Sequence, residues 1–262
     1  MYWIKAILVL ILVFYLLCGL FLYLFQDRLV FMPEALEDDF VFEFEADFNE
    51  INLEMEDGAV LNALHFKTSQ PKGLIVYFHG NAGNLSRWGE VVLPFVDRGY
   101  EVLIVDYRGY GKSTGKRSKK AMLNDSEVVY AYATNLWPQE KVIVYGRSLG
   151  SSFATHVGRQ FSPGQIILES PFFSVADVAR GIAWMYPVKQ IMRFNFQNGK
   201  STEIAAPITI LHGTEDLVVP FASGQKLSEA IKGSEFHPIE GGGHNDLANF
   251  KRYWDVIDKK LE

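Results

Sequence analysis

One serine of this chain has the neighbours that a nucleophilic serine requires. Ser148 is the middle residue of Gly146–Gly150, a G-x-S-x-G pentapeptide that directly follows the apolar run Val142–Tyr145. A sharp turn from strand to helix at such a motif exposes the serine hydroxyl at the carboxyl edge of a sheet, in strained backbone geometry. The sequence therefore predicts Ser148 as the nucleophile of an acyl-transfer reaction.

A serine hydroxyl needs a base, and the base needs a carboxylate that orients it. Asp216 follows the apolar run 207–211, and His244 follows the glycine loop 241–243, so both are expected at the same sheet edge as the serine. Nucleophile, acid and histidine then occur in the chain order that is typical of one fold class. Glu215 is the alternative carboxylate, because it is adjacent to Asp216.

Acyl transfer also needs hydrogen-bond donors for the developing oxyanion. The amide of Leu149, directly after the nucleophile, is one predicted donor. The loop 79–84 follows a predicted strand and contains two glycines, and its Asn81 amide is the predicted second donor. Two histidines in turns after strands, His79 and His212, more often tie such loops than take part in chemistry.

The elements that must position these residues are continuous apolar runs separated by segments of helical length. Strands that are apolar on both faces are typical of a parallel sheet covered on both sides, and their alternation with helices predicts a doubly wound α/β domain. The runs 40–44 and 51–55 instead alternate apolar with polar residues, which predicts edge strands, and Asp57-Gly58 predicts a hairpin turn. The predicted buried strands are 74–78, 102–105, 142–145, 165–168 and 207–211, followed by 235–239.

The interval 169–206 is longer than one crossover helix needs. Its aromatic content predicts a small helical cap over the site, although an ordinary pair of surface helices fits the same pattern. If it is a cap, its apolar side chains form the substrate pocket; these are Phe172, Phe173, Trp184, Met185 and Tyr186.

The residues 6–25 form an apolar run in which Gly19 is the one residue outside the apolar set. Twenty helical residues span about 30 Å, the thickness of bilayer hydrocarbon. The run lacks the small residues of a signal-peptide cleavage site, so a membrane anchor is predicted, preceded by the flank 1–5 and followed by a domain at 26–262. Lys5 favours an amino terminus on the inner side and the body on the far side.

Charge and cysteine content exclude several classes of function. The formal net charge is −6, which makes nucleic acid a poor partner because its phosphates repel an acidic domain. The only cysteine, Cys18, lies in the apolar run, so the body has neither a disulfide nor a thiolate metal site. We expect no metal and no cofactor. A basic cluster fits either docking onto anionic lipid head groups or an ordinary solvated loop; it comprises Lys112, Lys116, Arg117, Lys119 and Lys120.

In combination, these motifs resemble the α/β-hydrolase superfamily, and within it the Bem46-like group, which is often filed with serine aminopeptidase-like hydrolases. The resemblance covers about residues 26–262 and implies a Ser–His–Asp hydrolase with Ser148, His244 and Asp216 as the triad. Members of the group include protein depalmitoylases and lipid or ester hydrolases. The segments that carry the resemblance are 78–84, 106–113, 145–151, 168–172, 212–216 and 242–246.

The sequence thus predicts an α/β-hydrolase fold, with a mostly parallel sheet, helices on both faces and a small cap, behind one transmembrane helix. The expected function is a membrane-anchored serine hydrolase that cleaves carboxylic esters or thioesters of a lipid-like or acylated substrate. Its expected partners are that substrate and the bilayer. A serine peptidase of the aminopeptidase type and a catalytically idle binding module are the alternatives.

Overall fold

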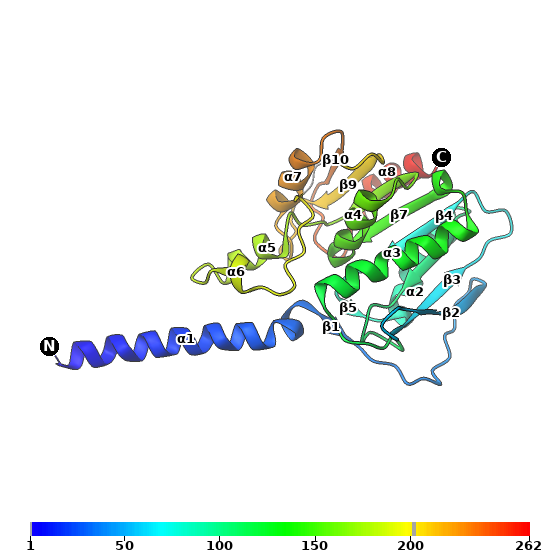
Figure 1. Ribbon diagram of the computed structural model, residues 1–262. Helices are drawn as coiled ribbons and strands as arrows, with labels where there is room; N and C mark the ends of the chain where they lie inside the picture. Colours follow the sequence, from blue (N-terminus) through cyan, green and yellow to red (C-terminus); the bar gives the residue numbers. More distant parts are fainter. Residues whose placement is uncertain (1, 201–202) are drawn as a thin grey trace.

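An eight-stranded sheet is the centre of the structure, a computed structural model that describes residues 2–200 and 203–262 (Figure 1). The strand order is β10-β9-β8-β7-β4-β6-β3-β2, in which β2 and β3 pair antiparallel, as do β3 and β6, and the other pairs are parallel. The strands are β2 (Phe48–Glu54), β3 (Val60–Phe66), β4 (Leu74–Phe78), β6 (Glu101–Val105), β7 (Val142–Arg147), β8 (Gln165–Glu169), β9 (Ile208–Gly213) and β10 (Glu235–Ile239).

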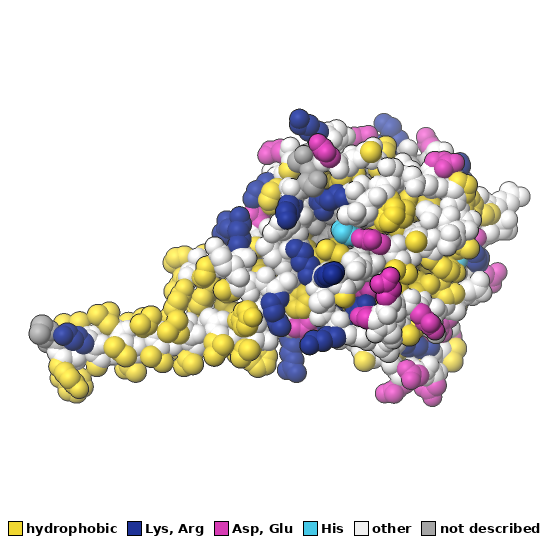
Figure 2. Space-filling model, viewed as in Figure 1, with side chains coloured by type: hydrophobic (Ala, Val, Ile, Leu, Met, Phe, Trp, Pro, Cys, Tyr) yellow, Lys and Arg dark blue, Asp and Glu magenta, His cyan; other side chains and the backbone are white. Residues whose placement is uncertain are grey.

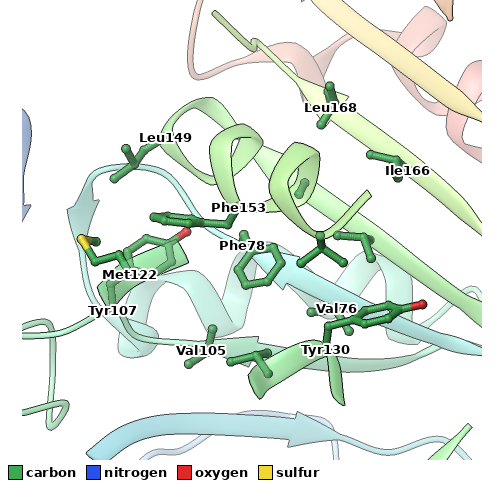
Figure 3. Packing of buried hydrophobic residues seen from close by; sticks show 14 of the residues in the cluster. Val76, Phe78, Val105, Tyr107, Met122, Tyr130, Leu149, Phe153, Ile166 and Leu168 are labelled. Atoms are coloured by element: carbon green, nitrogen blue, oxygen red, sulfur yellow. The ribbon is translucent and has the colours of Figure 1, made fainter. Parts of the chain in front are cut away.

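Helices cover both faces of this sheet, because successive strand residues point to opposite faces. In β4, Val76 and Phe78 face one core cluster with α3 and α4, whereas Ile75 and Tyr77 face another with α2 and α8. Figure 3 shows Phe153 of α4 beside Phe78 and Tyr107 in the first cluster. The helices are α2 (Leu85–Val96), α3 (Lys119–Leu136), α4 (Ser151–Gln160), α7 (Phe221–Ala230) and α8 (Lys251–Leu261), with 3-10 turns at Gln139–Lys141, Ser148–Gly150 and Leu247–Asn249.

The predicted α/β architecture is confirmed, with one error at its edge. The run 40–44 is not a strand. Its alternation instead buries Phe42 and half-buries Phe44, whose ring packs on Phe66 of β3 at 5.2 Å and lies against Gly89 of α2. The segment therefore crosses the face of the sheet, where an extended chain has no strand to pair with. The predicted hairpin at Asp57-Gly58 does join β2 to β3.

The amino-terminal helix α1 (Tyr2–Val30) contains the whole predicted anchor and is longer than it. It is long and apolar enough to cross a membrane, and it projects from the body (Figure 1). Between β8 and β9, in the interval predicted as a cap, the chain forms α5 (Val175–Ile182) and α6 (Val188–Ile191). Met1 of the predicted flank and residues 201–202 of the predicted cap lie outside the described residues.

A short parallel ladder connects α1 to the body. Strand β1 (Met32–Pro33), directly after α1, pairs with β5 (Ala82–Gly83) in the loop that was predicted to supply an oxyanion donor. One residue earlier in that loop, the Asn81 carbonyl accepts from the Met32 amide at 2.9 Å. Helix α1 is thus joined to the predicted site by backbone hydrogen bonds.

Arg108 is the buried cation on which the loop after β6 depends. Its side chain is only 4% exposed and donates to both oxygens of Asp125 in α3, at 2.7 Å each, and to Asp57 in the β2–β3 turn. Burial raises the pKa of Asp125, while hydrogen bonds from Arg108 oppose that rise. Each of these buried charges would destabilise the fold without its partner, and pairing them offsets the cost of removing both from water.

We expect Arg108→Met to lower the free energy of unfolding by about 3–5 kcal/mol, because it leaves the buried Asp125 carboxylate without its cation. Urea unfolding followed by circular dichroism measures this change. The matched control is Lys251→Ala, which removes an exposed pair with Asp255 and should cost about 0.5 kcal/mol or less. Equal effects of the two substitutions would contradict the role assigned to Arg108.

Candidate active site

Ser148 lies at a sharp turn between β7 and α4. Its φ is +50°, in the left-handed region that side chains rarely adopt. The turn needs the glycines on both sides: a Cβ on Gly146 would lie 2.6 Å from the Gly150 carbonyl oxygen, and one on Gly150 would meet the Phe78 carbonyl oxygen. The Leu149 side chain packs in the core cluster (Figure 3), which anchors the turn from below.

The structure brings the three predicted triad residues together. Nε2 of His244 lies 3.0 Å from Oγ of Ser148, and Nδ1 of the same ring lies 2.7 Å from Oδ2 of Asp216. With the proton on Nδ1, the ring donates to the carboxylate and accepts from the serine hydroxyl. This arrangement can remove the serine proton and stabilise the resulting imidazolium. Glu215, the alternative carboxylate, is exposed.

Asp216 is held by three further groups. Its Oδ1 accepts from the amides of Val218 and Val219, at 2.9 and 2.8 Å, and Nε2 of His212 lies 3.3 Å from its Oδ2. Burial alone would raise the pKa of Asp216, but hydrogen bonds from His212 and His244 outweigh it and hold that pKa well below its ordinary value. His212 also bonds the Val219 carbonyl, which ties the loop as the sequence predicted.

A buried arginine next to the nucleophile was missed at the sequence level. Arg147, the residue directly before Ser148, contacts Glu169 of β8 at 3.1 Å. It also donates to Asn245, the residue after His244, at 3.3 Å. Tyr145 completes the network by donating to Glu169 at 2.5 Å. Arg147 therefore links the turn at Ser148 to the loop that contains His244. The sequence did offer a signal for this residue, because Arg147 is the one charged residue in the otherwise uncharged strand β7.

The loop 79–84, which contains the predicted oxyanion donor Asn81, is fixed from several sides. Nδ1 of His79 lies 2.6 Å from the Gly80 carbonyl oxygen, and because a carbonyl only accepts, the ring donates. In a trans peptide the following amide, that of Asn81, then points the opposite way. Within the described part of the chain this amide donates to no other group. A Cβ on Gly80 would lie 3.9 Å from the Cβ of Ser148, so the loop is adjacent to the nucleophile.

Two tyrosines donate to two further carbonyls of that loop. Tyr107 donates to the His79 carbonyl at 2.6 Å, and Tyr110 donates to the Asn81 carbonyl at 2.7 Å. Both lie on the loop after β6 that Arg108 secures. The geometry of Asn81, one of the two predicted oxyanion donors, therefore depends on residues from the loop after β6.

The five predicted pocket residues do not come together. Phe172 is buried in the core, and Phe173 lies half-buried under the Lys226 ammonium, 4.2 Å from its ring centre. Trp184 and Met185 are exposed, and the Tyr186 ring stacks on α1. The cap prediction assumed that this segment folds back over Ser148, whereas its apolar middle follows α1. A cavity of about 290 Å³ between α3, α4 and residues 196–200 includes none of the five.

Comparison with known proteins identifies a matching family and several proteins of similar sequence. The model of the family described as "Serine aminopeptidase, S33" matches residues 69–198, which include Ser148 and the oxyanion loop. An uncharacterised protein of Mycobacterium tuberculosis is 28% identical over 87% of this chain and 83% of its own. Lysophosphatidylserine lipase ABHD12 of Danio rerio is 31% identical over 62% of this chain and 47% of its own.

Among solved structures, an esterase of Pyrococcus furiosus shares the fold. It superposes with a TM-score of 0.69 over 88% of this chain and 96% of its own. Its sequence identity to this chain is 19%, so the likeness is one of fold.

We expect the stabilisation that the Asp216 carboxylate provides to be lost in acid. Because its pKa is lower in the folded chain than the ordinary 3.8, the ionised group stabilises the fold fully above that pH and progressively less as the pH falls below it. The free energy of unfolding, measured with urea for wild type and Asp216→Asn, should differ most at neutral pH and converge below pH 3.8. A difference that grows in acid would contradict the depressed pKa.

Proposed function

The chain belongs to the α/β-hydrolase superfamily, and on that premise we propose that it is a membrane-anchored serine hydrolase that cleaves carboxylic esters or thioesters. The observation that supports this most strongly is the hydrogen-bonded series Ser148, His244 and Asp216, with Ser148 in a left-handed turn. Three such groups in hydrogen-bond contact have little use in a purely structural protein, because the strained turn and the buried carboxylate both cost stability.

The proposed reaction has two halves that use the same residues. His244 takes the proton of Ser148 as Oγ attacks the carbonyl carbon, and the amides of Asn81 and Leu149 donate to the oxyanion. His244 then gives that proton to the leaving alkoxide or thiolate, and the acyl group stays on Ser148. His244 then deprotonates a water molecule, whose oxygen attacks the acyl carbon. The bond from that carbon to Oγ of Ser148 breaks, and His244 returns the proton to Oγ, which releases the acid and restores the serine. Asp216 remains ionised throughout and stabilises the imidazolium.

The proposed location follows from α1 and its flanks. Helix α1 has 29 residues, and an 18-residue stretch of it has a mean hydropathy of 2.9, which suits a single membrane span. In this arrangement residues 6–25 lie in the hydrocarbon and residues 26–262 form the catalytic domain. Lys5 precedes the span, while Asp27 and Arg28 cancel each other after it. We infer that the amino terminus is inside and that the catalytic domain is on the far side.

A serine peptidase is the second candidate, and the matching family supports it because that family is described as serine aminopeptidase. The named relatives support the ester reading instead, since one is described as a lipase and the fold neighbour as an esterase. The two candidates share the triad and differ in the leaving group, which is an alkoxide or thiolate for one and an amine for the other.

Ser148→Ala should abolish labelling by a fluorophosphonate probe and lower kcat by about a millionfold, because the triad then lacks its nucleophile. Gel fluorescence after probe treatment measures the labelling. The matched control is Ser152→Ala, one helical turn along α4, whose buried hydroxyl has no hydrogen-bond partner among the described residues. Labelling that persists in Ser148→Ala would reject the assignment of the nucleophile.

A substrate series separates the candidates. We expect p-nitrophenyl esters and matched thioesters to be cleaved with a kcat/KM that rises with acyl length, by up to about fourfold per methylene if each CH2 is fully buried at 0.8 kcal/mol. Aminoacyl amides should be poor substrates. Faster cleavage of the amides would favour the peptidase, and correctly folded protein that cleaves none of the compounds would favour an idle binding module.

A further inference from the structure

The tip of the segment between β8 and β9, residues 183–187, exposes large apolar side chains. Trp184 is 74% exposed and Met185 is 56% exposed. They lie together on a short connection between α5 and α6, next to a helix that is itself apolar. Figure 2 shows the hydrophobic surface of α1 continuing onto the adjoining part of the body. In water such a contiguous apolar patch is unfavourable, so its natural environment is apolar.

Several contacts fix the tip to the middle of α1. The ring of Tyr186 stacks on that of Tyr15, with centres 4.6 Å apart. The Tyr15 hydroxyl donates to the Met185 carbonyl at 2.8 Å, and the Tyr186 hydroxyl donates to the Tyr15 carbonyl at 3.1 Å. Gly19 makes room for the Tyr186 ring, because a Cβ there would lie 3.0 Å from it.

Further contacts continue toward the end of α1. The Gln26 side chain accepts from the Arg193 amide at 2.6 Å and donates to the Ile191 carbonyl at 3.3 Å. Beyond it, Phe31 and Phe194 pack edge to face. Residues 185–194 therefore run beside α1 in the same direction, from the level of Tyr15 to that of Phe31.

This pairing sets the depth of the tip relative to the membrane. Gln26 is the first polar residue after the apolar run, and Tyr15 precedes it by eleven residues, which is about 16 Å along a helix. The hydrocarbon of a bilayer is about 30 Å thick. A side chain held at the level of Tyr15 is therefore near the centre of that layer when 6–25 spans it.

We propose that the tip, residues 183–187, is a second membrane-inserted element, with Trp184 and Met185 in contact with lipid acyl chains of the leaflet next to the catalytic domain. This inference rests on the proposed function, because it requires α1 to span the bilayer. It adds that the domain enters the leaflet itself.

The polar groups near the tip are compatible with insertion. The Tyr186 amide donates to the Ala183 carbonyl at 3.0 Å, and the Met185 carbonyl accepts from Tyr15. Hydrogen-bonded backbone groups can enter hydrocarbon, whereas unpaired ones are costly there. Arg193 lies nearer the body than the tip does: its guanidinium is 5.7 Å from the ring centre of Tyr23, close to the end of the apolar run.

Basic side chains gather where the body meets α1 (Figure 2), as expected at an anionic head-group layer. The predicted basic cluster contributes to this region only in part. Lys112 pairs with Glu50, Arg117 pairs with Asp27, and Lys119 donates to the Asn195 carbonyl. Lys116 and Lys120 stay exposed, so three of the five cations stabilise the fold and two remain for lipid.

The inserted segment also leads to the candidate site. It continues to Asn198, whose side chain donates to Ser151 at 2.8 Å, and Ser151 in turn donates to the Ser148 carbonyl. The segment that carries the tip is thus tied by hydrogen bonds to the turn at Ser148. The substrate class that fits is an ester or thioester whose acyl chain resides in the bilayer.

The experiment uses single cysteines in the full chain, after Cys18→Ala removes the only native thiol. An environment-sensitive fluorophore is attached at Trp184→Cys, with Phe14→Cys as the lipid-facing reference beside Tyr15. The water-facing control is Leu136→Cys. Leu136 is exposed at the end of α3, about 27 Å from the start of that helix, where Lys119 contacts the segment that carries the tip. Each protein is reconstituted in phosphatidylcholine and phosphatidylglycerol vesicles, with and without acyl-chain spin labels that quench the fluorophore.

We expect position 184 to be quenched and shifted to shorter wavelength like position 14, while position 136 is unchanged by the spin labels. If 14 is quenched and 184 behaves like 136, the insertion is wrong and the anchor stands. If neither 14 nor 184 is quenched, the anchor itself fails and the inference fails with it. Fluorophosphonate labelling at the wild-type rate shows that each variant is folded.

Discussion

The close approach of β7 and α4 at Ser148 is the constraint on which the rest of the structure depends. A residue in the left-handed region costs of order 1–3 kcal/mol, and it persists only where its surroundings determine it fully. Here Gly146 and Gly150 let strand, helix and the end of β4 meet, and Leu149 fills the core below them. The parallel sheet then presents the ends of β4, β7 and β9 at the same edge.

Buried polar groups connect this edge into one unit. Arg147 and Glu169 join β7 to β8, and Asn245 connects Arg147 to the histidine loop. On the other side, Tyr107 and Tyr110 hold the oxyanion loop. Each of these polar atoms would be costly if left unpaired away from water, so their pairing stabilises the geometry of the site.

The anchor is part of the same unit. Backbone pairing of β1 with β5 joins the end of α1 to the oxyanion loop, and the Asn81 side chain donates to the Val30 carbonyl at 3.2 Å. Removing residues before the body would therefore disturb one side of the candidate site. Under the proposed function α1 has two roles, since it holds the protein at a bilayer and braces the candidate site.

Local pattern alone determined the elements and the residue types at their ends. The strand Leu74–Phe78 was predicted with its observed bounds, because a continuous apolar run in a parallel sheet leaves few alternatives. The meeting of Ser148, Asp216 and His244 was predictable for a related reason, since the carboxyl ends of parallel strands share an edge. Only the tertiary structure decided between Glu215 and Asp216 and directed Trp184 toward the anchor. Those outcomes depend on contacts such as that of Tyr15 with Tyr186, between segments too far apart in the chain for any local pattern to encode.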